Sequence, residues 1–240
     1  IKNLKKGTNI FYHGEIEIKN ILQVFKIIIN NIGNKKKTKN INCCSFIITT
    51  TMKSFIINYE YKYKIVSLNT QINFEQNEKV KFALNIKNII IIVSNYNIYL
   101  FGNDTKLILI SKLNLKEKNK IPLLVKYNSN IQGLFIYFNN NILVKYNIDI
   151  KEGKILGNQI ILNNVNISNF DVCEKFLIFS KWDDNLLGVY SFNNQKVVYI
   201  DFIGESFIHV YISSIQIIKI NRQYKIFVSL SLGKLICLFI

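Results

Sequence analysis

The sequence has little of what enzymes and nucleic-acid readers usually need. It contains two histidines and four cysteines, and Arg222 is its single arginine. Lysine therefore supplies nearly all of the net charge of +16, whereas proteins that read bases and phosphates usually rely on the planar fork of arginine. Because the chain is also rich in Ile, Asn, Tyr and Phe, we attribute the basic charge to A/T-rich codons. We expect nucleic-acid binding to be weak and to collapse between low and physiological salt.

The lysines form one dense cluster. Residues 35–39 read KKKTK and lie with Asn30, Asn31 and Gly33 between two apolar runs. We interpret this cluster as a solvated loop, and the alternative is a loop that contacts phosphate.

The cysteines and histidines have no spacing that fits a metal site. The four cysteines are Cys43, Cys44, Cys173 and Cys237. The first two are adjacent and point to opposite faces of a predicted strand, so they cannot bind one ion together. We interpret all four as buried, reduced thiols of an intracellular protein. His13 and His209 have no cysteine, serine or paired carboxylate at a catalytic spacing, and we interpret both as structural.

Motifs for enzymatic chemistry are missing as well. The carboxylates are scattered: Asp183 and Asp184 fit a turn, and Glu15 and Glu17 share the solvent face of a predicted strand. No glycine-rich phosphate loop, nucleophile elbow or Walker pattern occurs, and apolar runs such as residues 89–93 are too short to span a bilayer. The sequence therefore predicts no enzyme, no catalytic, cofactor or metal site, no small-molecule substrate and no membrane association.

What the sequence does contain is a repeated hairpin, clearest at residues 176–192 (FLIFSKWDDNLLGVYSF). Two apolar strands flank Trp182, Asp183 and Asp184. Aspartate bonds its own backbone in turns, and β-branched and aromatic flanks favour strands. We expect the Trp182 ring to pack at the end of a sheet, so that its truncation to alanine costs about 3–5 kcal/mol. The alternative is that Trp182 is an exposed anchor for a partner, since tryptophan is enriched at binding hot spots.

The same pattern recurs along the chain. The predicted strand pairs are 1–4 with 9–12, 45–51 with 54–59, 89–93 with 98–101, 134–138 with 142–146, 176–179 with 186–190, and 226–230 with 235–239. The turn centres are about 43 to 49 residues apart by subtraction, and a period of about 40–45 residues in strand-rich sequence is typical of four-stranded propeller blades. No hairpin carries a Gly-His and Trp-Asp pair at WD40 spacing. The alternative is a β-sandwich, which also has frequent turns.

We therefore predict an all-β, WD40-like β-propeller. It would be an open arc of about five four-stranded blades, with residues 1–240 forming a single partial domain. The chain does not begin with Met, opens inside one hairpin and stops directly after another. We therefore expect a fragment of a larger multi-propeller protein.

Several stretches resemble, in order, one known family. They are residues 3–10, 88–100, 182–184, 202–205 and 227–235. The family is that of the large subunit of the UV-damaged-DNA-binding protein, with the cleavage/polyadenylation factor and splicing factor 3b large subunits as paralogues, and the resemblance is to its middle, second propeller. The Trp182 turn is most similar to the damage-binding member, whereas residues 231–233 (SLG) replace the family's Gly-Asp-Gly. The stretches include a structural turn motif of Trp182, Asp183, Asp184, Gly204 and Gly233.

The resemblance implies a scaffold, because the middle propeller of the damage-binding adaptor docks a cullin ubiquitin-ligase scaffold. We accordingly expect a nuclear, non-enzymatic protein-interaction scaffold linked to the DNA-damage response. The alternative is a subunit of a pre-mRNA splicing or 3′-end-processing complex with nucleic-acid contacts. The expected partners are a cullin scaffold or RNA-processing subunits, with nucleic acid bound only weakly. No cofactor is expected.

Overall fold

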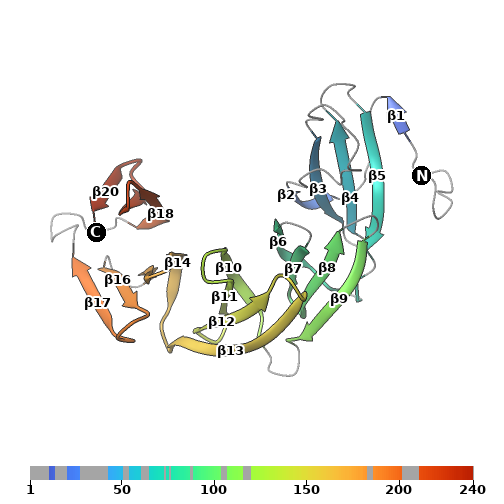
Figure 1. Cartoon of the computed structure of the whole chain (residues 1–240). Helices are drawn as coiled ribbons and strands as arrows, with labels where there is room; N and C mark the ends of the chain where they lie inside the picture. Colours follow the sequence, from blue (N-terminus) through green and yellow to red (C-terminus); the bar gives the residue numbers. More distant parts are fainter. Residues whose placement is uncertain are drawn as a thin grey trace. The chain divides into compact units, whose positions relative to one another are not determined.

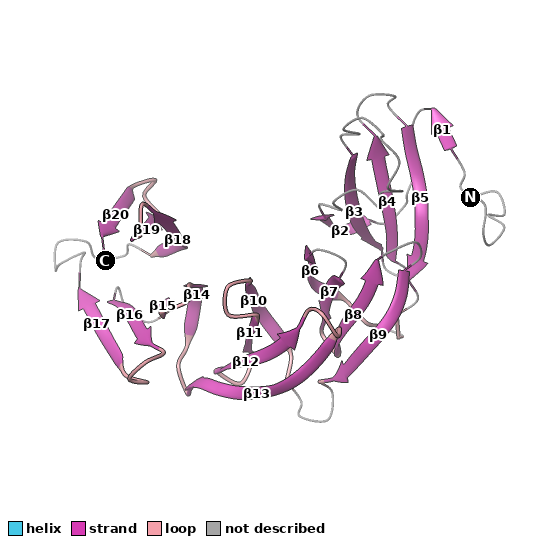
Figure 2. Cartoon of the chain, viewed as in Figure 1, coloured by secondary structure: helices cyan, strands magenta, loops and turns pink. Residues whose placement is uncertain are grey.

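The computed structural model of the chain is built from β-strands (Figures 1 and 2). It describes residues 11–13, 21–27, 43–50, 54–60, 65–72, 74–75, 77–86, 89–103, 107–115, 120–182, 186–201 and 211–239. No helix is assigned in these ranges, and accordingly none of them holds a helix that could cross a membrane. By their contacts the residues divide into two compact units, a first unit of residues 1–121 with 149–155 and a second unit of 122–148 with 156–240.

The first unit contains two antiparallel sheets among its described residues. One has the order β1-β5-β4-β3-β2 and consists of β1 (Phe11–His13), β2 (Ile21–Ile27), β3 (Cys43–Thr50), β4 (Ser54–Glu60) and β5 (Ile65–Ile72). The other runs in chain order and consists of β6 (Val80–Ile86), β7 (Ile89–Ser94), β8 (Asn97–Asn103) and β9 (Leu107–Asn114).

Three further sheets follow, each in chain order. The first consists of β10 (Pro122–Asn128), β11 (Gly133–Phe138), β12 (Ile142–Asp149) and β13 (Lys154–Asn163). The second consists of β14 (Ile167–Val172), β15 (Phe176–Lys181), β16 (Leu186–Ser191) and β17 (Val197–Asp201). The third consists of β18 (Ile212–Ile220), β19 (Gln223–Leu230) and β20 (Leu235–Phe239).

The predicted hairpins are confirmed wherever they fall on described strands. They are the pairs β3–β4, β7–β8, β11–β12, β15–β16 and β19–β20. The sixth predicted hairpin, residues 1–12, lies almost wholly outside the described residues. The all-β prediction is therefore correct, and three of the five antiparallel sheets among the described residues have the predicted four strands.

In three of these sheets the second strand (β7, β11 or β15) is a continuous apolar run, whereas β19 alternates along its length. All six residues of β7 and all six of β11 are buried, as are five of the six in β15. A strand that is covered on both faces has no polar side, which explains why these segments read as runs such as IIIIV rather than as alternating patterns. Their burial fixes each hairpin at the centre of its sheet.

The period of about 45 residues has a structural basis in the second unit. There the first strands β10, β14 and β18 begin at Pro122, Ile167 and Ile212, and β14 lies beside both of the others. Side chains of one sheet form hydrogen bonds with backbone groups of the next sheet that lie about one period further along the chain. Asn128 Nδ2 donates to Val172 O at 2.9 Å, Asn169 Nδ2 donates to Ser213 O at 3.1 Å, and Asp171 Oδ2 accepts from Ile217 N at 2.7 Å.

A backbone hydrogen bond also recurs with the period. The amide of a residue in the turn after the second strand donates to a carbonyl just before the first strand of the same sheet. The three bonds are Asn95 N to Lys79 O at 3.0 Å, Trp182 N to Asn166 O at 3.1 Å, and Ser231 N to Tyr211 O at 2.8 Å. Asn95, Trp182 and Ser231 therefore occupy equivalent turn positions.

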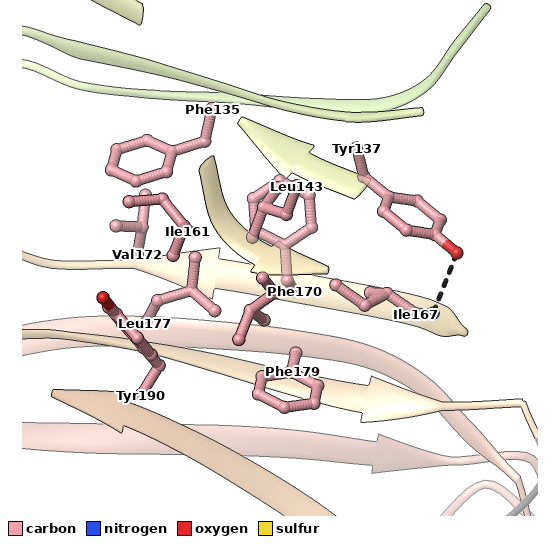
Figure 3. Close-up of a cluster of buried hydrophobic side chains, with 11 residues drawn as sticks. Phe135, Tyr137, Leu143, Ile161, Ile167, Phe170, Val172, Leu177, Phe179 and Tyr190 are labelled. Carbon is pink, nitrogen blue, oxygen red and sulfur yellow. Dashed lines mark hydrogen bonds between the residues drawn. The ribbon is translucent and has the colours of Figure 1, made fainter. Parts of the chain in front are cut away.

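An apolar cluster of the second unit lies between the sheets β10–β13 and β14–β17 (Figure 3). It includes the fully buried rings of Phe135 and Phe179. Tyr137 brings its hydroxyl to the edge of this cluster, where the oxygen accepts from Ile167 N at 3.1 Å and the proton bonds Asn141 Oδ1 at 2.8 Å. This pairing satisfies a buried polar group, which would otherwise cost about 1–3 kcal/mol.

Candidate functional site

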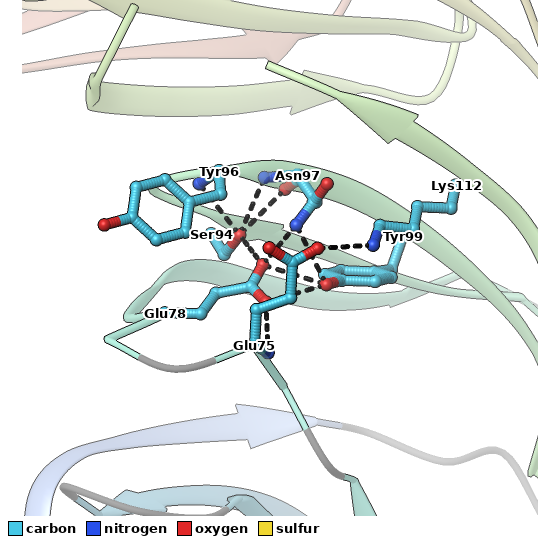
Figure 4. A network of polar contacts seen from close by, with 7 residues as sticks. All are labelled: Glu75, Glu78, Ser94, Tyr96, Asn97, Tyr99 and Lys112. Atoms are coloured by element: carbon cyan, nitrogen blue, oxygen red, sulfur yellow. Dashed lines mark hydrogen bonds and ion pairs between the residues drawn. The ribbon is translucent and has the colours of Figure 1, made fainter. Parts of the chain in front are cut away.

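A polar network in the first unit centres on the carboxylate of Glu78, just before β6 (Figure 4). Its Oε1 accepts from Asn97 Nδ2 at 2.8 Å and from the Ser94 hydroxyl, and its Oε2 accepts from Tyr99 OH at 2.8 Å. The backbone amide of Glu75 donates to the same Oε2 at 2.9 Å. Ser94 and Asn97 are completely buried.

The surroundings of Glu78 point to a fastening role. The Ser94 oxygen accepts the amides of Tyr96 and Asn97 at 3.1 and 2.8 Å, which shapes the turn between β7 and β8. Burial, supported by the hydrogen bond to Glu78, raises the pKa of Tyr99 above its usual range. Since both carboxylate oxygens are occupied by protein donors, the network ties the segment before β6 to the β7–β8 hairpin.

A different surface lies at the ends of the last two sheets in the second unit. We call it the turn surface and define it by Trp182, Tyr211 and Leu232, which are 61%, 57% and 61% exposed. Trp182 and Leu232 follow second strands, and Tyr211 precedes a first strand, so all three lie at the same end of neighbouring sheets. The Ser231 hydroxyl accepts a hydrogen bond from the amide of Tyr211 at 3.1 Å, which joins the β19–β20 turn to the segment before β18.

The expectation that the Trp182 ring packs into a sheet end is wrong, because the side chain is mostly exposed. Two serines lie on the strands next to Trp182: Ser180, which is fully buried, and Ser168 have their hydroxyl oxygens 2.8 Å apart.

The other members of the predicted turn motif are only partly visible. Asp183, Asp184 and Gly204 lie outside the described residues. Gly233 lies in the β19–β20 turn with φ of +76°, a left-handed conformation that favours glycine, and its amide donates to Leu230 O at 3.0 Å. Its structural role stays a prediction.

The cysteines divide between the interior and the surface. Cys173 is buried and unpaired, and burial raises the pKa of its thiol. Cys237 is exposed, so the expectation that every cysteine is buried is wrong; it alternates with the half-buried Ile236 and Leu238 along β20. The side chains of Cys43 and Cys44, and those of both histidines, lie outside the described part. Within the described residues no three His, Cys, Asp or Glu side chains gather as metal ligands.

A polar row crosses the opposite end of the second unit. Glu174, in the β14–β15 turn, accepts from Asn130 Nδ2 at 2.8 Å and forms an ion pair with Lys219. The Lys219 ammonium is the main reason that the pKa of Glu174 falls to about 2. The three residues come from three successive sheets, 44 and 45 positions apart, so the row fastens these sheets together.

Comparison with solved structures supports the fold and not an activity. No protein-family model and no curated protein matches the sequence. The β-propeller domain of Cps50 (Swd1) from Myceliophteria thermophila is 7% identical over 82% of this chain and 67% of its own, with a TM-score of 0.59. The C-terminal WD40 domain of Sif2 is 13% identical over 81% of this chain and 54% of its own, with a TM-score of 0.58. The chain therefore has a WD40-like β-propeller fold.

Propellers of this likeness differ in what they do. A Saccharomyces cerevisiae structure of Dbp5 bound to Nup159 and Gle1 matches at a TM-score of 0.50 and 11% identity, over 82% of this chain and 58% of that one. The dihydro-heme d1 dehydrogenase NirN, an enzyme, matches with a TM-score of 0.54 and 13% identity, over 81% of this chain and 42% of its own. This chain thus spans about half the length of several solved chains that it matches. The fold by itself therefore does not determine what this chain does.

Proposed function

We propose that this chain is a non-enzymatic scaffold that binds a protein partner through the turn surface. The observation that carries the proposal is the exposure of Trp182 on a turn whose backbone is held by Asn166. Tryptophan and tyrosine supply a large share of binding energy at interfaces, and an anchor on a fixed backbone loses little entropy on binding. Tyr211 and Leu232 are exposed at the same end of the neighbouring sheet.

The finer proposal is that the partner is a cullin-type ubiquitin-ligase scaffold, in a nuclear adaptor of the DNA-damage response. It is supported by the resemblance of the Trp182 turn and of residues 202–205 and 227–235 to the damage-binding adaptor family. That support is independent of the exposure of Trp182.

A second candidate is a subunit of an RNA-processing complex that contacts nucleic acid. It is favoured by the distribution of charge: residues 1–121 hold 20 lysines and 7 carboxylates, whereas residues 122–240 hold 11 lysines and arginines and 8 carboxylates. The excess positive charge is therefore concentrated in one part of the sequence, as it is in proteins with a polyanion-binding region.

One experiment separates the two candidates. The 240-residue chain is titrated at physiological salt with a cullin scaffold, and in parallel with single-stranded RNA and duplex DNA. We expect a saturable complex with the cullin, together with nucleic-acid binding that is weak and falls steeply with salt. Absence of a cullin complex combined with tight binding of a defined RNA or DNA sequence would replace the first candidate with the second.

A further inference from the structure

A small pocket lies in the second unit, between the sheets β10–β13 and β14–β17. Its volume is about 220 Å³. It is lined by the ends of strands and turns that include the β14–β15 and β16–β17 turns, which lie at the opposite end of the sheets from Trp182. It is therefore separate from the turn surface.

The floor of the pocket is aromatic and well supported. Tyr190 and Phe192 meet edge to face with ring centroids 5.7 Å apart, and Phe192 is also 5.9 Å from the fully buried ring of Phe135. Tyr190 itself belongs to the apolar cluster of Figure 3. Such a floor is suited to the methylene groups of a ligand rather than to water.

Among the described residues, the polar groups of the pocket leave one positive charge, that of Lys145, without a partner. Glu174 is already paired with Lys219 and Asn130. Lys145 makes no hydrogen bond or ion pair with any described residue, and the side-chain amides of Gln159 and Gln195 are likewise without a partner in the described part of the chain. An ammonium and two amide groups together offer hydrogen-bond donors to an anion.

The size of the pocket limits what can fill it. Pockets for drug-sized ligands and cofactors measure about 300–1,000 Å³, whereas a single water needs about 10–15 Å³. At about 220 Å³ this pocket is too small for a typical cofactor and large enough for one amino-acid side chain. A glutamate side chain, which carries a carboxylate on an apolar stem of two methylene groups, fits within this volume.

We propose that the pocket binds a glutamate side chain from an extended segment of a protein partner. The carboxylate accepts from Lys145, with Gln159 and Gln195 as further donors, and the methylene groups lie on the Tyr190 and Phe192 rings. This inference rests on the proposed scaffold function, and it adds a second contact, of defined chemistry, at the other end of the second unit.

The test uses the 240-residue chain and a minimal probe, N-acetyl-glutamate N-methylamide, with the glutamine analogue as the neutral control. Binding is followed by backbone NMR shifts at the pocket. We expect saturable shifts at Gln195 with glutamate, and an affinity at least about tenfold lower for the glutamine analogue, the size of one charge-assisted hydrogen bond. Lys145→Gln is expected to weaken glutamate binding by the same factor. Lys196→Gln, which removes an exposed lysine next to the pocket, is expected to leave it within about twofold.

Three results would overturn the inference. They are equal binding of the two analogues, unchanged binding in Lys145→Gln, and binding of inorganic phosphate at least as tight as that of glutamate, which would indicate a general anion site. The scaffold function is judged separately. Cullin binding that survives Lys145→Gln would leave the scaffold in place and remove only the pocket contact, whereas absence of cullin binding in the wild type would count against the scaffold.

Discussion

Asn95 and Trp182 occupy the same position in two different sheets and use it in opposite ways. Each follows the second strand of its sheet, and each donates its amide to the segment before the first strand. The Asn95 side chain turns inward, where its Oδ1 accepts from Lys79 N at 2.7 Å and its Nδ2 donates to Asn77 O at 3.3 Å. The Trp182 side chain turns outward into solvent.

The two sheets also differ in whether Tyr99 and Phe179, an aromatic side chain of each, form polar or apolar contacts. In β6–β9 the third strand carries Tyr99, which lies opposite Ile92 and donates its hydroxyl to Glu78. In β14–β17 the second strand carries Phe179, which lies opposite Gly188 and has no side-chain group that can form a hydrogen bond. In β6–β9 the side chain at the turn position, Asn95, is used for hydrogen bonds within the sheet, whereas in β14–β17 the Phe179 ring packs on Gly188 and the side chain at the turn position, Trp182, stays exposed.

The largest effect is expected from Gly188→Ala, which tests the packing of Phe179 on Gly188. A Cβ at this position would meet three Phe179 ring atoms at 2.2, 2.5 and 2.7 Å, and the ring is fully buried. We expect a loss of about 3 kcal/mol in the free energy of unfolding, at the upper end of the usual cost of overpacking. Urea unfolding measures it. In a Phe179→Leu background the same change should cost less, and equal costs in both backgrounds would show that the ring is not the obstacle.

The variant Glu78→Ala tests the hydrogen-bond network around the Glu78 carboxylate. Removing the carboxylate takes the acceptor from the Tyr99 hydroxyl and one of two acceptors from the Asn97 amide, while the Ser94 hydroxyl keeps Asn97 O as an acceptor. We expect destabilisation of about 2 kcal/mol, since each buried donor left unpaired costs about 1–3 kcal/mol and water can reach some of them. Glu75→Ala is the matched control, because Glu75 forms an exposed ion pair with Lys112 that is worth about 0–1 kcal/mol. Equal losses in the two variants would contradict the fastening role.

A smaller effect is expected from Glu174→Gln, and it depends on pH. The pKa of Glu174 is lowered from 4.5 to about 2 in the folded chain, so its ionised form stabilises the fold above pH 4.5, and this contribution is lost as the pH falls from 4.5 towards 2. The difference in melting temperature between wild type and variant should therefore be largest near neutral pH and vanish near pH 2.

Glu152→Gln is the control for that series. Its carboxylate is 65% exposed in a 3.7 Å ion pair with Lys154, so little difference from the wild type is expected at any pH. A pH-independent difference for Glu174→Gln would show that its ion pair with Lys219 does not contribute to stability.

The sequence was sufficient to predict the hairpins that contain β7, β11 and β15, because burial on both faces makes these second strands apolar runs. The flanking strands are harder to recognise. β13, for example, has a mostly exposed surface with Leu156 and Ile160 facing solvent, so its pattern carries little periodicity. The 45-residue period indicated that such strands had to exist, but not where they begin and end.

The polar network around Glu78 was missed for a physical reason. Its members come from a loop, a strand end and a third strand that are up to 21 positions apart, and only the fold brings them together. The one local signal was the turn Ser94 to Asn97, whose polar residues end an otherwise apolar run. The outward orientation of Trp182 was also beyond the sequence, because the alternation of faces along a strand ends where the turn begins.

Trp182→Ala tests the central claim most directly, when folding and binding are measured on the same 240-residue sample. We expect the free energy of unfolding to change by no more than about 0.5 kcal/mol, as for other surface residues, and cullin affinity to fall at least about tenfold. Leu156→Ala, which is 67% exposed in the same unit and away from the turn surface, should change neither quantity. A loss of about 3–5 kcal/mol in stability, with binding reduced only in proportion to unfolding, would show that Trp182 is a packing residue and contradict the account.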